Sequence, residues 1–297
     1  MKPTDSESSS SYAPSHRVAV LDGEMAYVDV GHGEPVVFLH GNPTSSYMWR
    51  HILPSVESSR CLAPDLIGMG ASAPSPRRAY RFSDHSAYLD AWFDTLQLGN
   101  VILVMHDWGV PLGVYWARRF PQRVAGLAYM EGQVRPRHWS DLPPGRDKFF
   151  RALRGPEGER LALDENFFLE KMFFGDVLTP LSEADKNAYR APYAEDRESR
   201  WPTLVWPREI PFDGEPADTH AVISDNGEWL AASTLPKLFV NAEPGNSIAG
   251  ETRDFCRRFA NQREITVPGR HYVPEDAPQA IGAALNAFVR DIRRAPA

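Results

Sequence analysis

Short strand-like segments that alternate with helical patterns constrain the fold of this 297-residue chain more than any other feature. The segments are too short to be helices of ordinary length, and most are followed by apolar residues at helical spacing. They are Pro35–Leu39, Val101–Met105, Val124–Met130, Pro236–Val240 and Glu264–Val267. This alternation predicts an α/β fold, in which helices cover both faces of a mostly parallel sheet.

Further segments extend this pattern at both ends of the chain. Arg17–Leu21 and Met25–Val30 flank a turn sequence and predict a β-hairpin, and Cys61–Pro64 predicts a weaker strand. A helical pattern begins at Ser83. The last helix carries apolar residues at helical spacing from Ile281 to Ile292, so one of its faces is expected to lie on the sheet.

One stretch interrupts the alternation and sets the expected domain boundaries. From about residue 134 to 210 no clear strand is found, and the stretch is rich in Pro and in paired Phe residues. We therefore predict a helical cap at 134–212, inserted between two parts of an α/β core at 16–133 and 213–297. Residues 1–15 are rich in Ser and lack a cationic start before an apolar run, which predicts a disordered leader and no secretory signal.

Composition excludes several classes of protein. The formal charge of −7 offers no basic field for nucleic acid or an anionic membrane, and the longest apolar runs are far shorter than a membrane span. Cys61 and Cys256 cannot form a disulfide framework, so a reducing, cytoplasmic location is expected. Two Cys and scattered His build no four-ligand zinc pattern, and no metal site is predicted.

The segment from Val104 to Gly109 has the context of a nucleophile elbow. A buried strand ends, a turn follows, and a helix begins, with Asp107 at the position where related enzymes hold a nucleophile. An Asp that simply caps the helix would look the same. As a nucleophile, a carboxylate suits displacement at an sp³ carbon with a good leaving group, which favours alkyl halides or epoxides as substrates.

Two further segments fit a hydrolase built around this elbow. His40-Gly41-Asn42-Pro43 follows the first core strand, where a loop commonly supplies oxyanion-hole N–H groups; Asn42 and Trp108 would donate them, although a simple turn is the alternative. His271 follows the last predicted strand and precedes the final helix, the expected place for a catalytic base.

A third member, a carboxylate, would orient His271. Glu131 and Glu243 both follow predicted strands, and either could accept the His271 N–H and stabilise the imidazolium. The residues themselves do not decide between the two.

Together these motifs resemble those of the haloalkane dehalogenases, within the α/β-hydrolase superfamily. The resemblance covers nearly the whole chain after about residue 15. It is carried by the blocks His40–Arg50, His106–Gly109, Met130-Glu131 with Arg135-Pro136, Leu238–Gly245 and His271–Asp276. It implies an α/β-hydrolase fold with an eight-stranded sheet and an inserted helical cap.

The resemblance also implies a role for each site residue. Asp107 would be the nucleophile and His271 the base for the hydrolytic water, and the Met130-Glu131 block favours Glu131 as the acid that orients His271. The side-chain amide of Asn42 and the indole N–H of Trp108 would hold the departing halide. Neutral donors suit a soft anion in a mostly dry pocket.

Pocket residues follow from the same resemblance. Trp206 could shape the ceiling of the pocket, and Asp176, Ser247 and Ile248 fall where the access tunnel would open. The predicted pocket-lining residues are Phe150, Phe168, Pro207, Ile210, Ser247 and Tyr272.

The implied reaction converts a small apolar haloalkane and water into an alcohol, a halide ion and a proton. It passes through a covalent ester on Asp107 and needs no cofactor, neither a metal nor an organic group. An epoxide hydrolase is the nearest alternative, with Tyr189 and Tyr193 as acid donors, but Asn42 stands where that family typically has an aromatic residue. Fluoroacetate-type dehalogenases have Arg at the position of Trp108. A cofactor-free oxygenase and a catalytically silent ligand-binding homologue remain further alternatives.

Overall fold

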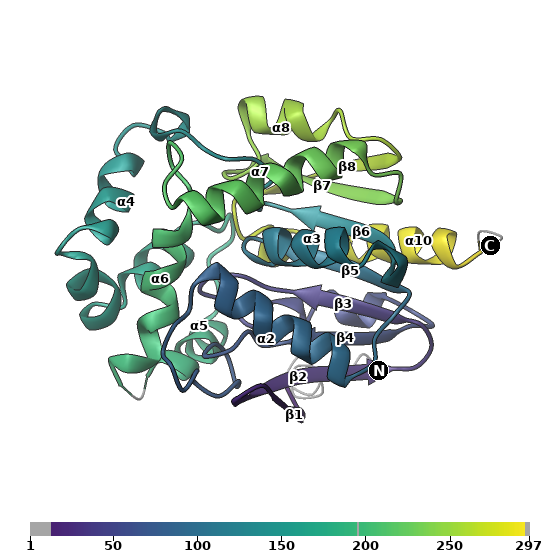
Figure 1. Ribbon diagram of the computed structural model, residues 1–297, viewed down its shortest axis with the longest axis horizontal. Helices are drawn as coiled ribbons and strands as arrows, with labels where there is room; N and C mark the ends of the chain where they lie inside the picture. Colours follow the sequence, from purple (N-terminus) through teal and green to yellow (C-terminus); the bar gives the residue numbers. More distant parts are fainter. Residues whose placement is uncertain (1–12, 195, 295–297) are drawn as a thin grey trace.

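The computed structural model describes residues 13–194 and 196–294, so most of the predicted leader at 1–15 lies outside the described residues. An eight-stranded sheet forms its centre, in the order β1-β2-β4-β3-β5-β6-β7-β8 (Figure 1). The pairs β1–β2 and β2–β4 are antiparallel and all others are parallel. The strands are β1 His16–Val20, β2 Gly23–Gly31, β3 Pro35–Leu39, β4 Arg60–Pro64, β5 Val101–His106, β6 Val124–Met130, β7 Lys237–Pro244 and β8 Gln262–Gly269.

The central strands β3, β5 and β6 are almost entirely apolar because both of their faces are buried. Successive side chains of a strand point to opposite faces, and β3 shows the result: Val37 and Leu39 belong to one core, whereas Val36 and Phe38 belong to the other. Helices therefore have to cover both faces of the sheet.

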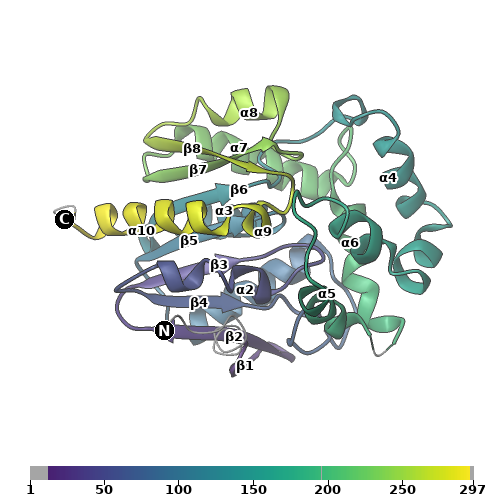
Figure 2. The same cartoon turned by 180° about the vertical axis from the view of Figure 1, so that it is seen from behind.

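Figures 1 and 2 show these two helical layers and a third group of helices beyond the sheet. Helices α2, α3 and α7 lie on one face, and α10 lies on the other. Helices α4, α5 and α6 lie beyond the carboxyl ends of the parallel strands, over the edge where the predicted site residues gather. The helices are α2 Phe82–Thr95, α3 Gly109–Arg119, α4 Arg146–Arg154, α5 Glu183–Arg190, α6 Trp201–Glu209, α7 Ala217–Ala232, α8 Gly250–Cys256, α9 Val273–Asp276 and α10 Pro278–Arg294.

The segment between β6 and α7 has a small apolar core of its own. Leu153 on α4, Leu204 on α6 and Phe168 pack together there with Ala162 and Leu163. Two π-helical turns, Arg160–Asp164 and Phe168–Phe173, connect its helices. The cap boundaries at 134 and 212 remain a prediction.

No helix in the described part of the chain is long and apolar enough to cross a membrane.

The predicted α/β-hydrolase fold is confirmed. Several strand ends lie one or two residues from their predicted positions, and two details differ more. Helix α7 is not predicted, because buried Thr219, Asn226 and Gly227 stand on its inner face beside Ile223 and Leu230 and hide the apolar spacing. Strand β7 runs on to Pro244, further than its predicted end, because β8 pairs with it as far as Gly269.

Candidate active site

Asp107 lies on a tight turn between β5 and α3, with its backbone in the left-handed region at a φ of 50°. This is a sparsely populated conformation for a residue with a side chain, and such strain clusters at functional sites. Close packing around the turn requires small neighbours: a Cβ at Gly41 would overlap the Asp107 carboxylate and the Trp108 backbone nitrogen. A Cβ at Gly109 would overlap the carbonyl oxygen of Leu39.

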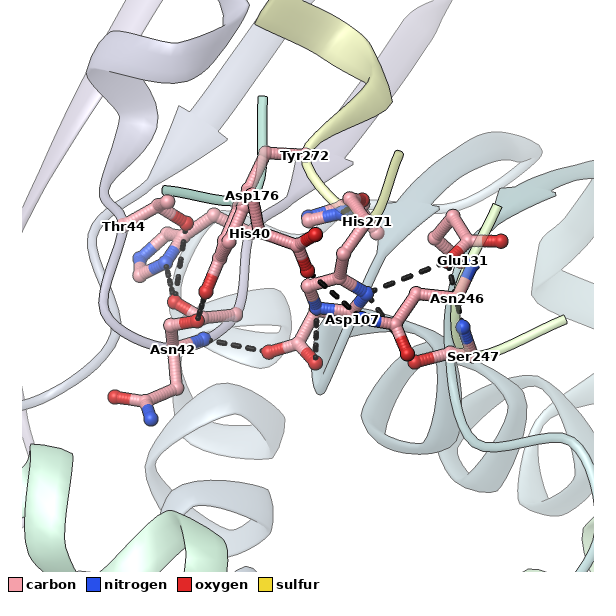
Figure 3. Close-up of polar contacts among 12 residues, drawn as sticks. His40, Asn42, Thr44, Asp107, Glu131, Asp176, Asn246, Ser247, His271 and Tyr272 are labelled. Atoms are coloured by element: carbon pink, nitrogen blue, oxygen red, sulfur yellow. Dashed lines mark hydrogen bonds and ion pairs between the residues drawn. The ribbon is translucent and has the colours of Figure 1, made fainter. Parts of the chain in front are cut away.

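The Asp107 carboxylate is held from two sides (Figure 3). The backbone N–H of Asn42 donates to its Oδ1 at 2.7 Å, and Nε2 of His271 lies 3.2 Å from its Oδ2. Burial raises the pKa of Asp107, but the hydrogen bonds and positive charge around it outweigh burial and hold the pKa below its usual value. Asp107 is therefore ionised at neutral pH.

His271 lies between two carboxylates. Its Nδ1 is 3.4 Å from Oε2 of Glu131, on the side opposite Asp107. Burial lowers the pKa of His271, but the hydrogen bonds and charges of Asp107 and Glu131 together raise it to about 10. The imidazole is therefore protonated at neutral pH as long as both carboxylates are charged.

Glu131 is completely buried and its position is fixed by backbone donors. Its Oε2 accepts the N–H groups of Asn246 and Ser247 at 2.9 and 2.7 Å, and its Oε1 accepts that of Ile248 at 3.3 Å. Ile248 thus contributes its backbone N–H and is not among the residues that line the cavity, and its expected place where the access tunnel opens stays a prediction. Glu243 is exposed near the end of β7, so the geometry favours Glu131 as the partner of His271.

Two uncharged donors lie beside Asp107. The Asn42 side chain is 3% exposed, and within the described residues neither atom of its amide has a hydrogen-bond partner. The indole of Trp108 stacks on Trp206 of α6, with ring centroids 4.5 Å apart. Trp206 in turn stacks on His85. This stack of three rings holds the Trp108 indole in one orientation. An unpartnered buried amide is costly unless a ligand supplies its partner.

These residues surround one cavity between the core and the segment above it. The predicted lining residues all contribute to it: Phe150, Phe168, Pro207, Ile210, Ser247 and Tyr272, with Asn42, Asp107, Trp108, His271 and Asp176. Six further residues that line the cavity were not predicted from the sequence: Gln133, Arg137, Leu142, Arg146, Met172 and Asn246. Gln133 and Arg137 follow Glu131 in the same loop. Two polar residues so close after a candidate site carboxylate were the signal in the sequence that could have placed them in the cavity lining.

The lining departs from the expectation of an apolar pocket. Aromatic and aliphatic side chains form one wall, whereas Gln133, Arg137, Asn246 and Ser247 form a polar wall in the loops after β6 and β7.

Comparison with known proteins shows which proteins this chain is similar to. A family model described as alpha/beta hydrolase fold matches residues 34–278. A haloalkane dehalogenase of Sphingobium indicum is 51% identical over 94% of this chain and 96% of its own length, and one of Mycolicibacterium smegmatis is 48% identical over 91% and 88%. The crystal structure of haloalkane dehalogenase DbeA from Bradyrhizobium elkani superposes with a TM-score of 0.91 at 44% identity, covering 95% of this chain and 99% of that one.

Proposed function

The chain belongs to the haloalkane dehalogenase family of the α/β-hydrolase fold, and from that premise we propose which of its residues carry out carbon–halogen hydrolysis. One observation carries the proposal. An ionised carboxylate, Asp107, lies between the unpartnered amide of Asn42 on one side and the His271–Glu131 pair on the other.

The first step is displacement at carbon. An oxygen of Asp107 forms a bond to the halogen-bearing carbon as the carbon–halogen bond breaks, and the halide leaves with the bonding electron pair. The Asn42 amide and the Trp108 indole N–H donate to the halide, which is the anion that develops in the transition state. The product of this step is a neutral alkyl ester on Asp107.

The second step is hydrolysis of that ester. His271 removes a proton from a water molecule, whose oxygen attacks the ester carbonyl. The N–H of Asn42 already points at Oδ1 of Asp107, where charge develops in the tetrahedral intermediate. Collapse of the intermediate releases the alcohol and restores the Asp107 carboxylate beside a protonated His271.

The charge on Asp107 switches the protonation of His271 between the steps. Ester formation removes one of the two carboxylates that raise the pKa of His271 to about 10, so the pKa falls and the imidazole can release its proton. The neutral form that the hydrolysis needs is therefore produced by the alkylation itself.

This switch predicts a pH dependence for ester hydrolysis. Below the pKa that His271 has in the ester, the imidazole is protonated and cannot accept a proton, so hydrolysis slows about tenfold per pH unit. Above that pKa the rate is level. Rapid-quench measurement of alcohol formation after the first release of bromide checks this, and hydrolysis that speeds up as the pH falls would contradict it.

Glu131 acts through His271 as a positioning residue. Glu131→Gln is expected to slow turnover by roughly 10²-fold, because the imidazole loses its orientation and its second charge partner. The acid limb of hydrolysis should also move to lower pH, since a partner that raises the pKa of His271 has been removed. The matched variant Glu243→Gln changes an exposed carboxylate and should leave both rate and profile unaltered. The opposite pattern would make Glu243 the acid.

Asn42→Ala removes one halide donor. We expect kcat/KM for 1-bromobutane to fall by roughly 10²-fold, the usual cost of one donor to developing negative charge. Steady-state bromide release checks this. Loss of less than twofold would show that the halide leaves toward another part of the cavity.

The epoxide hydrolase alternative finds no support in the cap. Its two candidate acid donors point elsewhere, since the Tyr193 hydroxyl donates to the carbonyl oxygen of Pro43 at 3.0 Å and that of Tyr189 donates to Glu275. The test is incubation with 1-bromobutane and with 1,2-epoxybutane. Equal amounts of bromide and butanol, without diol from the epoxide, are expected; diol formation without bromide release would overturn the proposal.

The proposal includes a halogenated substrate and water as reactants and the halide ion as a bound product. It also keeps the cytoplasmic location expected from the sequence. Cys61 and Cys256 are buried free thiols, which fits a reducing compartment.

A further inference from the structure

The polar wall of the cavity contains a cation, Arg137, that has no carboxylate partner among the described residues. The Arg137 guanidinium lines the cavity and donates one hydrogen bond, from its Nη2 to the carbonyl oxygen of Ser247 at 2.5 Å. Among the described residues no carboxylate lies within 4.0 Å of it, although most arginines of this chain form such pairs. A guanidinium has five N–H donors, so most of its capacity is unused.

Gln133, two residues after Glu131, is a second unsatisfied group on the same wall. Its side chain is 5% exposed, and its Oε1 has no hydrogen-bond partner among the described residues. Buried polar groups in folded proteins are normally hydrogen-bonded, and an exception needs an explanation. An unpartnered amide oxygen and an unpaired guanidinium line one cavity, so the chain leaves both an acceptor and donors there for the polar groups of a ligand.

Arg146, the other cation that lines the cavity, has a carboxylate close to it. Nη2 of Arg146 lies 3.7 Å from Oδ2 of Asp176, which also accepts from the amide of Asn246 at 2.7 Å. Arg146 therefore has a charge partner within the chain. Burial and the nearby charge of Arg135 lower the pKa of Arg137, while the carboxylates of Glu131, Asp141 and Asp107 oppose that effect. Arginine side chains stay charged in proteins.

The two ends of the cavity lie on opposite sides of the nucleophile. The sheet order at this edge is β3-β5-β6-β7. Asn42 follows β3 and Asp107 follows β5. Arg137 follows β6, and Ser247, whose carbonyl oxygen accepts its hydrogen bond, follows β7. Figure 3 shows Asn42 on one side of Asp107 and Ser247 on the other. A substrate whose halogen faces Asn42 can extend its far end toward Arg137.

We propose that the cavity selects halogenated substrates that carry a carboxylate at the end opposite the halogen, bound by the guanidinium of Arg137. The inference rests on the proposed function, because it needs the halogen-bearing carbon at Asp107. A carboxylate is the group that best fits a guanidinium, through two parallel charge-assisted hydrogen bonds. Arg137 also offsets the repulsion that such an anion meets from Asp107.

The test compares ω-bromocarboxylates of three to five methylene groups with 1-bromobutane. The quantity measured is the ratio of kcat/KM for the best carboxylate to kcat/KM for 1-bromobutane, after subtraction of enzyme-free bromide release. Arg137→Met should lower this ratio by roughly 10- to 100-fold, as expected for loss of a charge-assisted hydrogen bond. Arg137→Lys should restore part of it. The matched control Arg263→Met removes an exposed cation on β8 and should leave the ratio as in the wild type.

The outcomes separate this inference from the proposed function. Bromide release from 1-bromobutane with an equal ratio in wild type and Arg137→Met would overturn the carboxylate assignment and leave the dehalogenase assignment standing. Absence of bromide from every substrate, with folded protein, would overturn both. Competitive inhibition of the wild type by butyrate, and not by butyramide, is a supporting result that needs no variant. Equal inhibition by the two compounds would count against the inference.

Discussion

Asp107→Asn is expected to abolish bromide release from 1-bromobutane, with a loss of roughly 10⁴-fold or more. Asn keeps the shape of the side chain and can still accept the N–H of Asn42. A neutral amide oxygen is, however, too weak a nucleophile to displace a halide at carbon. In the proposed mechanism the whole reaction passes through the Asp107 ester, so neither His271 nor Glu131 can compensate for the loss of this carboxylate.

The control for this prediction is Asp225→Asn, which changes an exposed Asp on α7 in a surface ion pair with Arg118. Such pairs contribute little, so its bromide release should match the wild type. Thermal unfolding of both variants shows whether either has lost its fold. A folded Asp107→Asn protein with bromide release within tenfold of the wild type would mean that water displaces the halide directly.

His271→Gln is expected to release about one equivalent of bromide per protein and then stop. Alkylation needs no base, so the first step proceeds, whereas hydrolysis loses the group that accepts the proton of water and slows by roughly 10³-fold. The alkyl ester therefore accumulates on Asp107. Intact-protein mass spectrometry should show the added alkyl group, in step with the burst of bromide.

His32→Gln is the matched control, since His32 is exposed in the turn before β3, and it should turn over like the wild type. Continued turnover by His271→Gln would assign the base to another residue. No burst at all, in a folded protein, would mean that His271 is needed for the first step.

Much of the fold was predictable because its signals are local. The strands at Pro35–Leu39 and Val124–Met130 have the predicted bounds, since a strand buried on both faces must be apolar along its whole length. Helix α7 could not be predicted in this way, because Asn226 on its buried inner face uses its Nδ2 to donate a hydrogen bond to the carbonyl oxygen of Pro111 on α3. Such a tertiary contact leaves no periodic signal in the sequence.

The candidate site was predictable as far as it follows from position in the fold. Asp107 and His271 follow strands at the edge where active sites of such folds lie, and the resemblance supplied their expected roles. The resemblance favoured Glu131 over Glu243, and the structure adds the burial of Glu131 and its three backbone donors from the loop after β7, which leave no signal in the sequence. Arg137 was not predicted as a site residue because what distinguishes it is the lack of a nearby carboxylate among the described residues. A sequence cannot show such a lack.

A single turnover in water enriched in ¹⁸O tests the central claim most directly. With the protein in excess over 1-bromobutane, the account predicts that butanol carries the unlabelled oxygen of Asp107, while ¹⁸O enters the Asp107 carboxylate. Mass spectrometry of the butanol and of the peptide that contains Asp107 measures both. Labelled butanol from an unlabelled Asp107 would contradict the account, because water would then have attacked the carbon without an ester intermediate.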